Sequence, residues 1–91
     1  MTHEERTKRA EYAQRLLEDS YFQSAFNDIR EKLVVALEEC NIGDHQKQTS
    51  ISDQIRQLSA VKKMIIMHIN DGKVAKTEIE RMNNPKVKRV V

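Results

Sequence analysis

The 91-residue sequence is poor in the residues that end helices or cross-link a chain. It has two glycines and one proline, which is too little turn chemistry for a β-rich fold with many tight turns. A single cysteine excludes an intramolecular disulfide framework and favours a reducing compartment. We therefore expect one small all-α domain.

Long hydrophobic runs are also missing. No apolar run approaches the roughly 20 residues of a membrane-spanning helix, and the N-terminus lacks the apolar region of a signal peptide. Charged residues make up 33% of the chain and hydrophobic ones 38%, so the core must be limited. We expect a cytoplasmic protein without a membrane partner.

Helical periodicity divides the first half of the chain in two. Residues 3–18 are predicted to form a first helix, with Glu4 and Glu5 favourable at its N-terminus. Asp19 or Ser20 then caps a second helix, with Gln23 at capping-box distance from Ser20. The second helix presents a seam with 4-3-4-3-4 spacing. Its members are Phe22, Phe26, Ile29, Leu33, Ala36 and Cys40. Gly43 is expected to stop it.

After a polar loop at 41–49, Ser50 or Ser52 is expected to cap a third helix. Its stripe has the same spacing and comprises Ile51, Ile55, Leu58, Lys62, Ile65 and Ile69. Gly72 is the expected terminator, and a short fourth helix follows at about 74–82. The predicted fold is an antiparallel helical hairpin with an N-terminal helix and a short C-terminal helix. It occupies a domain of residues 1–82, with a flexible basic tail at 83–91.

The stretch Lys62 to Ile69, KKMIIMHI, is apolar on nearly all sides of the third helix. Ile65 and Ile69 continue the hairpin stripe, but Met64, Ile66 and Met67 point in other directions at about 100° per residue. The first or fourth helix is one way to cover them. We favour a subunit interface of a homo-oligomer, formed by Met64, Ile66 and Met67, because flexible methionines suit irregular packing.

No pattern in the sequence indicates catalysis. Cys40 and His45 are two groups, whereas a metal site needs three or four ligands and a nucleophile needs a shaped pocket. We expect Cys40 to close the helix seam. The sequence thus predicts a non-enzymatic protein with no catalytic, cofactor or metal site.

The four aromatic residues fall within fifteen positions, at Tyr12, Tyr21, Phe22 and Phe26. Stacking of nucleic-acid bases would need exposed rings among basic side chains, but acidic residues surround these rings in the sequence. We expect them to pack in the core at the bend between the first two helices.

Charge is unevenly distributed. Residues 1–72 hold 10 Lys and Arg against 12 Asp and Glu, whereas residues 73–91 hold 6 against 2. The basic residues of the second segment are candidates for backbone contact with DNA without sequence readout. They are Lys73, Lys76, Arg81, Lys86, Lys88 and Arg89. The alternatives are that this basic segment is a solvated tail, or that it adds as a strand to a larger partner.

Two stretches of the chain resemble a known group of proteins. The first contains Arg9-Ala10, Leu16-Leu17-Glu18-Asp19, Phe22 and Ala25-Phe26; the second contains Gln57-Leu58, Val61-Lys62 and Ile69-Asn70-Asp71-Gly72-Lys73-Val74-Ala75. Together they resemble small all-helical proteins of tailed bacteriophages, encoded near packaging and head genes. Small terminase subunits are one such class, but this chain lacks their N-terminal helix-turn-helix.

The resemblance implies a bacteriophage protein in the host cytoplasm, or associated with the virion. We expect a homo-oligomeric structural or adaptor protein in DNA packaging or head assembly. Its partners would be further copies of itself, and DNA or a larger packaging or head protein. The alternative is a small accessory protein that inhibits a host factor or sequesters a small ligand.

Overall fold

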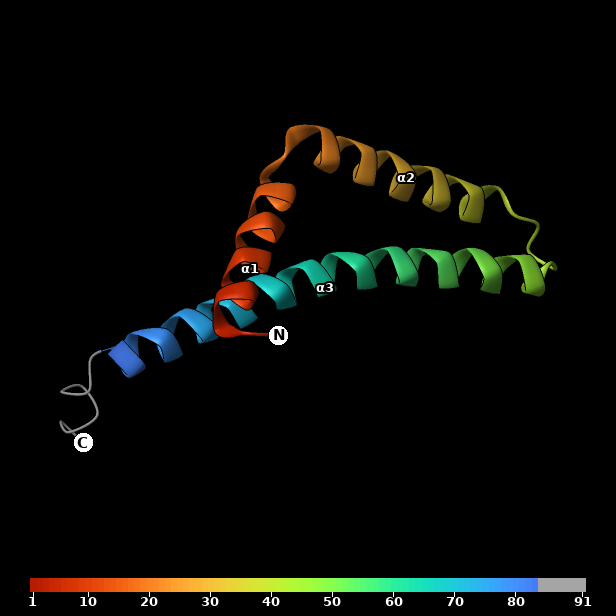
Figure 1. The fold of residues 1–91 in the computed structure, drawn as a ribbon. Helices are drawn as coiled ribbons and strands as arrows, with labels where there is room; N and C mark the ends of the chain where they lie inside the picture. The colour runs from red at the N-terminus through yellow and green to blue at the C-terminus, as the bar shows by residue number, and fades with distance from the viewer. Residues whose placement is uncertain (84–91) are drawn as a thin grey trace. The chain divides into compact units, whose positions relative to one another are not determined.

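The computed structural model describes residues 1–83 of the chain, and these form three helices (Figure 1). They are α1 (His3–Glu18), α2 (Ser20–Glu39) and α3 (His45–Asn83). No strand occurs in this described part, so the all-α prediction is confirmed. Nor is any of these helices long and apolar enough to span a membrane.

The break between α1 and α2 lies where the sequence predicts it. Asp19 is the N-cap, with φ −67° and ψ 123°, and its carboxylate accepts a hydrogen bond from the Phe22 amide at 2.8 Å. The capping box expected from Ser20 is wrong, because Ser20 is already helical. The Gln23 side chain instead donates to the Leu17 carbonyl at 2.7 Å, which accounts for one of the carbonyls that a helix end leaves unpaired.

The connection between α2 and α3 is shorter than the predicted loop at 41–49. Helix α2 ends at Glu39, where Cys40 is extended, so Gly43 is not its stop; no described glycine has a positive φ. Helix α3 begins at His45, and not at Ser50 or Ser52, because Asp44 accepts a hydrogen bond from the Lys47 amide at 3.1 Å. A short polar side chain before the helix thus supplies its cap.

The predicted end at Gly72 is also wrong. Helix α3 continues through Gly72 to Asn83, so the expected short helix at 74–82 is its last part. Gly72 is buried and has no positive φ. Packing against α1 explains why a glycine occupies this helical position.

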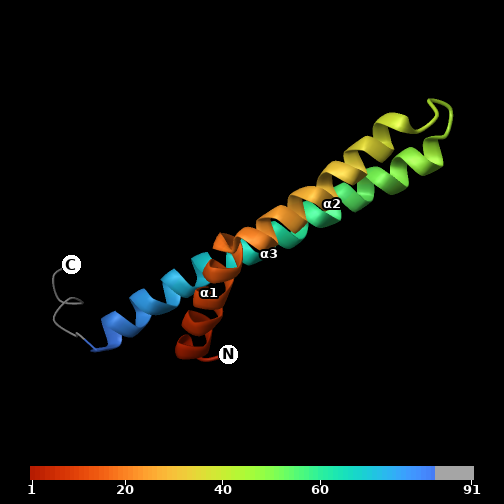
Figure 2. The same ribbon diagram turned by 90° about the horizontal axis from the view of Figure 1, so that it is seen from above.

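The described residues group into two compact units. The first unit contains residues 1–16 and α3 from Ile65 onward, and the second contains Leu17–Met64. In the second unit, α2 and the first half of α3 lie side by side in both views (Figures 1 and 2). The ring of Phe26 contacts the Lys62 amine, 5.6 Å from the ring centroid. Although Lys62 is charged, it occupies a position of the apolar stripe because its amine makes a cation–π contact with this ring.

The buried core is small. In the described part of the chain, the buried hydrophobic residues are Ala13, Ile51, Ile69 and Ala75. The predicted seam of α2 is half-buried, but its member Ile29 is 50% exposed. An isolated chain with so few buried side chains leaves much apolar surface in water.

Candidate binding surface

Small residues bring α1 and the second half of α3 together in the first unit. A Cβ at Gly72 would overlap the Cβ of Ala10 and lie 3.3 Å from the Arg6 carbonyl oxygen. Ala13 and Ala75 are buried in the same unit. Short side chains permit the close backbone approach, and that approach fixes where neighbouring charged groups meet.

An ion-pair cluster joins the two helices beside this crossing. The Arg6 guanidinium makes two hydrogen bonds to Asp71, at 2.7 and 2.9 Å, and Arg9 donates to the same carboxylate at 3.0 Å. Arg6 also reaches Glu78 at 3.5 Å, and His3 contacts that carboxylate. The Arg6–Asp71 pair is bidentate, the geometry that suits guanidinium and carboxylate best.

The Arg6–Asp71 pair changes the acid–base behaviour of both partners. The hydrogen bond from Arg6 lowers the pKa of Asp71 below its ordinary value, against the opposing effect of burial. The same bond raises the pKa of Arg6. Both shifts favour the charged forms, so the pair stabilises the crossing as an ion pair.

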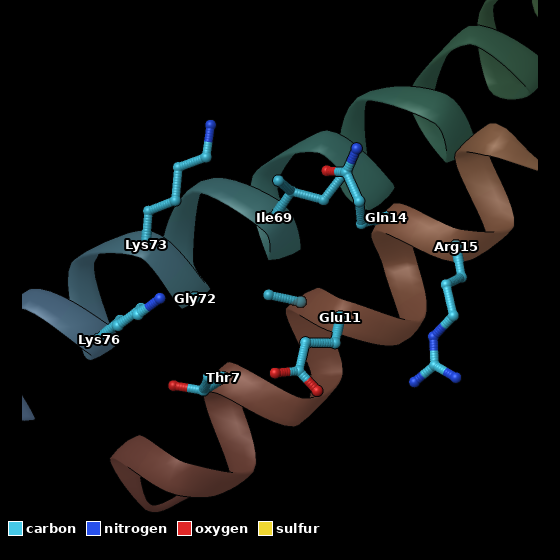
Figure 3. Close-up of a pocket in the computed structure, with 9 residues that line it drawn as sticks. Thr7, Glu11, Gln14, Arg15, Ile69, Gly72, Lys73 and Lys76 are labelled. Carbon is cyan, nitrogen blue, oxygen red and sulfur yellow. The ribbon is translucent and has the colours of Figure 1, made fainter.

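A groove opens along the crossing and is shown in Figure 3. We call it the α1–α3 groove. It has a volume of about 460 Å³ and is lined by Thr7, Ala10, Glu11, Gln14, Arg15, Ile69, Gly72, Lys73 and Lys76. Ala10, Ile69 and Gly72 form its apolar part. The groove is open to solvent and carries both apolar and charged side chains.

The charged lining of the α1–α3 groove is mainly basic. Arg15, Lys73 and Lys76 are opposed by one carboxylate, Glu11, and all four are exposed. The Arg15 guanidinium lies 4.8 Å from the ring centroid of Tyr12. Within residues 1–83, neither lysine forms an ion pair. The groove can therefore accept a partner that is apolar at its centre and acidic around it.

The predicted oligomer interface is exposed on α3. Met64 is 50% exposed, Ile66 40% and Met67 59%. At about 100° per residue, Met64 and Met67 lie on one side of the helix, whereas Ile66 points elsewhere. The helix therefore brings the two methionines together and separates Ile66 from them.

The predicted DNA-contact residues divide between two places. Lys73 and Lys76 line the α1–α3 groove, and Arg81 lines a second groove that Lys73 shares. Lys86, Lys88 and Arg89 lie outside the described residues, as does the predicted tail from residue 84 on. The described basic residues thus gather on the last part of α3, mixed with Glu78.

The aromatic cluster is only partly as expected. The rings of Phe22 and Phe26 pack together, with centroids 5.9 Å apart. Tyr12 and Tyr21 are 66% and 81% exposed, so their predicted place in the core is wrong. The hydroxyl group allows a tyrosine ring to stay in contact with water.

Cys40 is half-buried and free, and its sulfur lies 3.9 Å from the Asp44 carbonyl oxygen. No group of three potential metal ligands occurs among residues 1–83.

A second surface, on α2, was not anticipated from the sequence. We call it the outer face of α2, a shallow groove lined by Asp28, Glu31, Lys32, Val35, Ala36 and Glu39. Val35 is 43% exposed. At about 100° per residue it lies opposite Phe26, whose side faces α3. The charged residues of this face are three carboxylates and one lysine.

The comparisons with known proteins add no relative: no family model, no curated protein and no solved structure matches this chain.

Proposed function

We propose that the chain is a non-enzymatic subunit of a homo-oligomer that serves as a structural or adaptor protein. The supporting observation is the balance of buried and exposed apolar residues. Among residues 1–83, four hydrophobic residues are buried, two of them alanines, and no large side chain is fully buried. In contrast, thirteen large hydrophobic residues are exposed across the described chain. A core this small gives an isolated chain little stability, which favours burial of exposed apolar residues against a partner.

The methionine face of α3, formed by Met64 and Met67, is the proposed centre of one subunit contact. Val61 precedes Met64 by three residues and is 52% exposed, so the apolar strip extends along the helix. Methionine adapts to irregular partners. Ile66, on another side of α3, would belong to a separate contact.

The proposed biological setting is genome packaging or head assembly in a tailed bacteriophage, in the host cytoplasm or on the virion. It rests on the resemblance of the two sequence stretches described above. An oligomer would repeat the basic residues of each copy, and repetition strengthens weak contacts with DNA. Non-specific DNA contact through Lys73, Lys76 and Arg81, with Lys86, Lys88 and Arg89, is part of this proposal.

Light scattering on the eluting protein tests self-association. Met67→Asp is expected to lower the oligomeric mass, because a buried unpaired carboxylate opposes the contact, while helicity by circular dichroism stays unchanged. Gln54→Asp adds the same charge at an exposed position of α3 and is the control. A wild-type chain that is monomeric at micromolar concentration would overturn the proposal.

A mobility-shift assay tests the DNA component separately. Binding should weaken steeply with salt and fall when Lys73, Lys76 and Arg81 are replaced by glutamine. An unchanged shift in the substituted protein would remove these residues from the DNA contact and leave self-association untouched.

The α1–α3 groove supports a second candidate function, an accessory protein that binds a host factor or sequesters a small ligand. Its volume falls within the usual range for small-molecule sites. Calorimetry with a panel of small anionic ligands tests the ligand version, and recovery of a host protein by purified bait tests the other. Loss of either signal in Lys73→Glu with Lys76→Glu, which changes only exposed residues of the groove, would indicate that binding occurs there.

A further inference from the structure

We propose that the α1–α3 groove of one copy binds the outer face of α2 of a second copy. The inference rests on the proposed self-association and specifies two of the surfaces involved. It is independent of the methionine face of α3, which lines neither surface.

The apolar parts of the two surfaces match. Ala10, Ile69 and Gly72 give the α1–α3 groove an apolar lining. Val35 is the large apolar side chain of the outer face of α2, and it is 43% exposed because it points away from the side of α2 that faces α3. Insertion of Val35 into the groove would remove apolar surface from water on both copies.

The charges of the two surfaces are opposite. The groove carries three cations and one carboxylate, Glu11. The outer face carries three carboxylates and one cation, Lys32. Complementary charge of this kind steers association and selects the partner. The exposed lysines of the groove, which have no ion-pair partner within residues 1–83, would gain one in the contact.

DNA is the competing ligand for Lys73 and Lys76. The groove suits a helix face better, because a phosphate backbone offers no apolar group for Ile69 and Gly72. Glu11 inside the groove and Glu78 close by on α3 also repel phosphate. Both features are neutral or favourable for a helix that carries Val35 and Lys32.

The contact has a consequence for assembly. Since it joins two different surfaces of the same chain, it is either reciprocated in a two-fold dimer or repeated from copy to copy. A repeated contact closes into a ring or continues as a filament.

Reciprocal charge reversal tests the proposal on the full chain. Lys73→Glu with Lys76→Glu makes the groove acidic, and Glu31→Lys with Glu39→Lys makes the outer face of α2 basic. Each double variant alone should associate at least about tenfold more weakly than wild type in sedimentation experiments, because like charges then meet. An equimolar mixture of the two should associate more strongly than either double variant alone and approach wild type, since every contact between unlike copies is again complementary.

The matched control is Lys8→Glu with Arg56→Glu, which reverses two exposed cations outside both surfaces. It should associate like wild type, and circular dichroism must show all variants folded. If wild type is oligomeric and each double variant associates as strongly as wild type, this contact is overturned. It is also overturned if the mixture associates no more strongly than the double variants alone. Neither result overturns the proposed self-association. Loss of DNA binding without loss of association would reassign the lysines to DNA. A monomeric wild type would overturn the proposed function as well.

Discussion

Gly72 of α3 lies against Ala10 of α1 with no room for a side chain between them. A Cβ at Gly72 would overlap that of Ala10 and approach the Arg6 carbonyl oxygen to 3.3 Å. Glycine costs about 1 kcal/mol relative to alanine inside a helix. The close approach of the two helices offsets this cost, so the position is explained by packing and not by turn formation.

Gly72→Ala should therefore destabilise the protein, although alanine is the better helix former. Forcing a methyl group into a packed crossing typically costs about 1–3 kcal/mol. The higher helix propensity of alanine offsets about 1 kcal/mol of this cost. The difference is a net loss of up to about 2 kcal/mol in the free energy of unfolding, and the overlap with the Ala10 Cβ favours the upper end. Urea unfolding at fixed protein concentration measures it.

Gly43→Ala is the matched control for Gly72→Ala. A Cβ at Gly43 would have no atom within 4 Å, and its φ is not positive. It should leave stability unchanged or slightly higher. Adding Ala10→Gly to Gly72→Ala removes the overlapping methyl group and should recover part of the loss. Equal effects of the two alanines would contradict the packing explanation.

The Gly72 position shows where sequence reasoning ends. Helix 3–18 and the break at Asp19 depend on local signals, namely charges at the helix start and a capping side chain, and both were predicted. The prediction that the helix ends at Gly72 was wrong. The reason for a glycine at this position is Ala10, 62 positions earlier in the sequence, which leaves no room for a side chain. A glycine has the same local signature whether it ends a helix or allows another helix to approach.

The same contrast between local signals and distant contacts applies to the candidate sites. Periodicity indicated that Met64 and Met67 lie off the hairpin stripe, and both are exposed. It gave no sign of the Arg6–Asp71 pair, whose partners are 65 residues apart. The groove beside that pair exists only because two distant segments cross, so no local pattern could reveal it.

Asp71→Asn should change how stability depends on pH. The folded-state pKa of Asp71 is lowered by its hydrogen bond to Arg6. A lowered carboxyl pKa contributes stability that is present above the unfolded value, close to 3.8, and is lost as pH falls through the folded value. Wild type should therefore lose more stability than Asp71→Asn between pH 5 and pH 2, as measured by urea unfolding.

Asp53→Asn is the control for the Asp71 prediction, because Asp53 is exposed and forms no ion pair within residues 1–83. Its pH profile should follow wild type. Parallel profiles for wild type and Asp71→Asn would show that the pair does not contribute in solution.

Asp19→Ala should destabilise the chain by about 1 kcal/mol, the usual cost of removing an N-cap side chain. The Asp19 carboxylate accepts the Phe22 amide at 2.8 Å, and the substitution leaves that amide without this partner. Ser20→Ala is the control, because Ser20 lies in the first turn of α2 and is exposed. A larger loss of stability for Ser20→Ala than for Asp19→Ala would mean that Ser20 is the N-cap, as the capping-box pattern suggested.

Ile51→Ala should have the largest effect of the substitutions considered. Ile51 is 6% exposed and is the one buried residue of the second unit, Leu17–Met64. Removing a buried isoleucine side chain costs about 2–5 kcal/mol, and Ile51→Val about 0.5–1.5 kcal/mol. Ile42→Ala makes the same chemical change at a residue that is 90% exposed, where surface substitutions stay within about 0.5 kcal/mol. Urea unfolding followed by circular dichroism should rank them Ile51→Ala, Ile51→Val and Ile42→Ala. An equal loss at positions 51 and 42 would mean that Ile42 is covered in solution, as it would be inside a subunit contact.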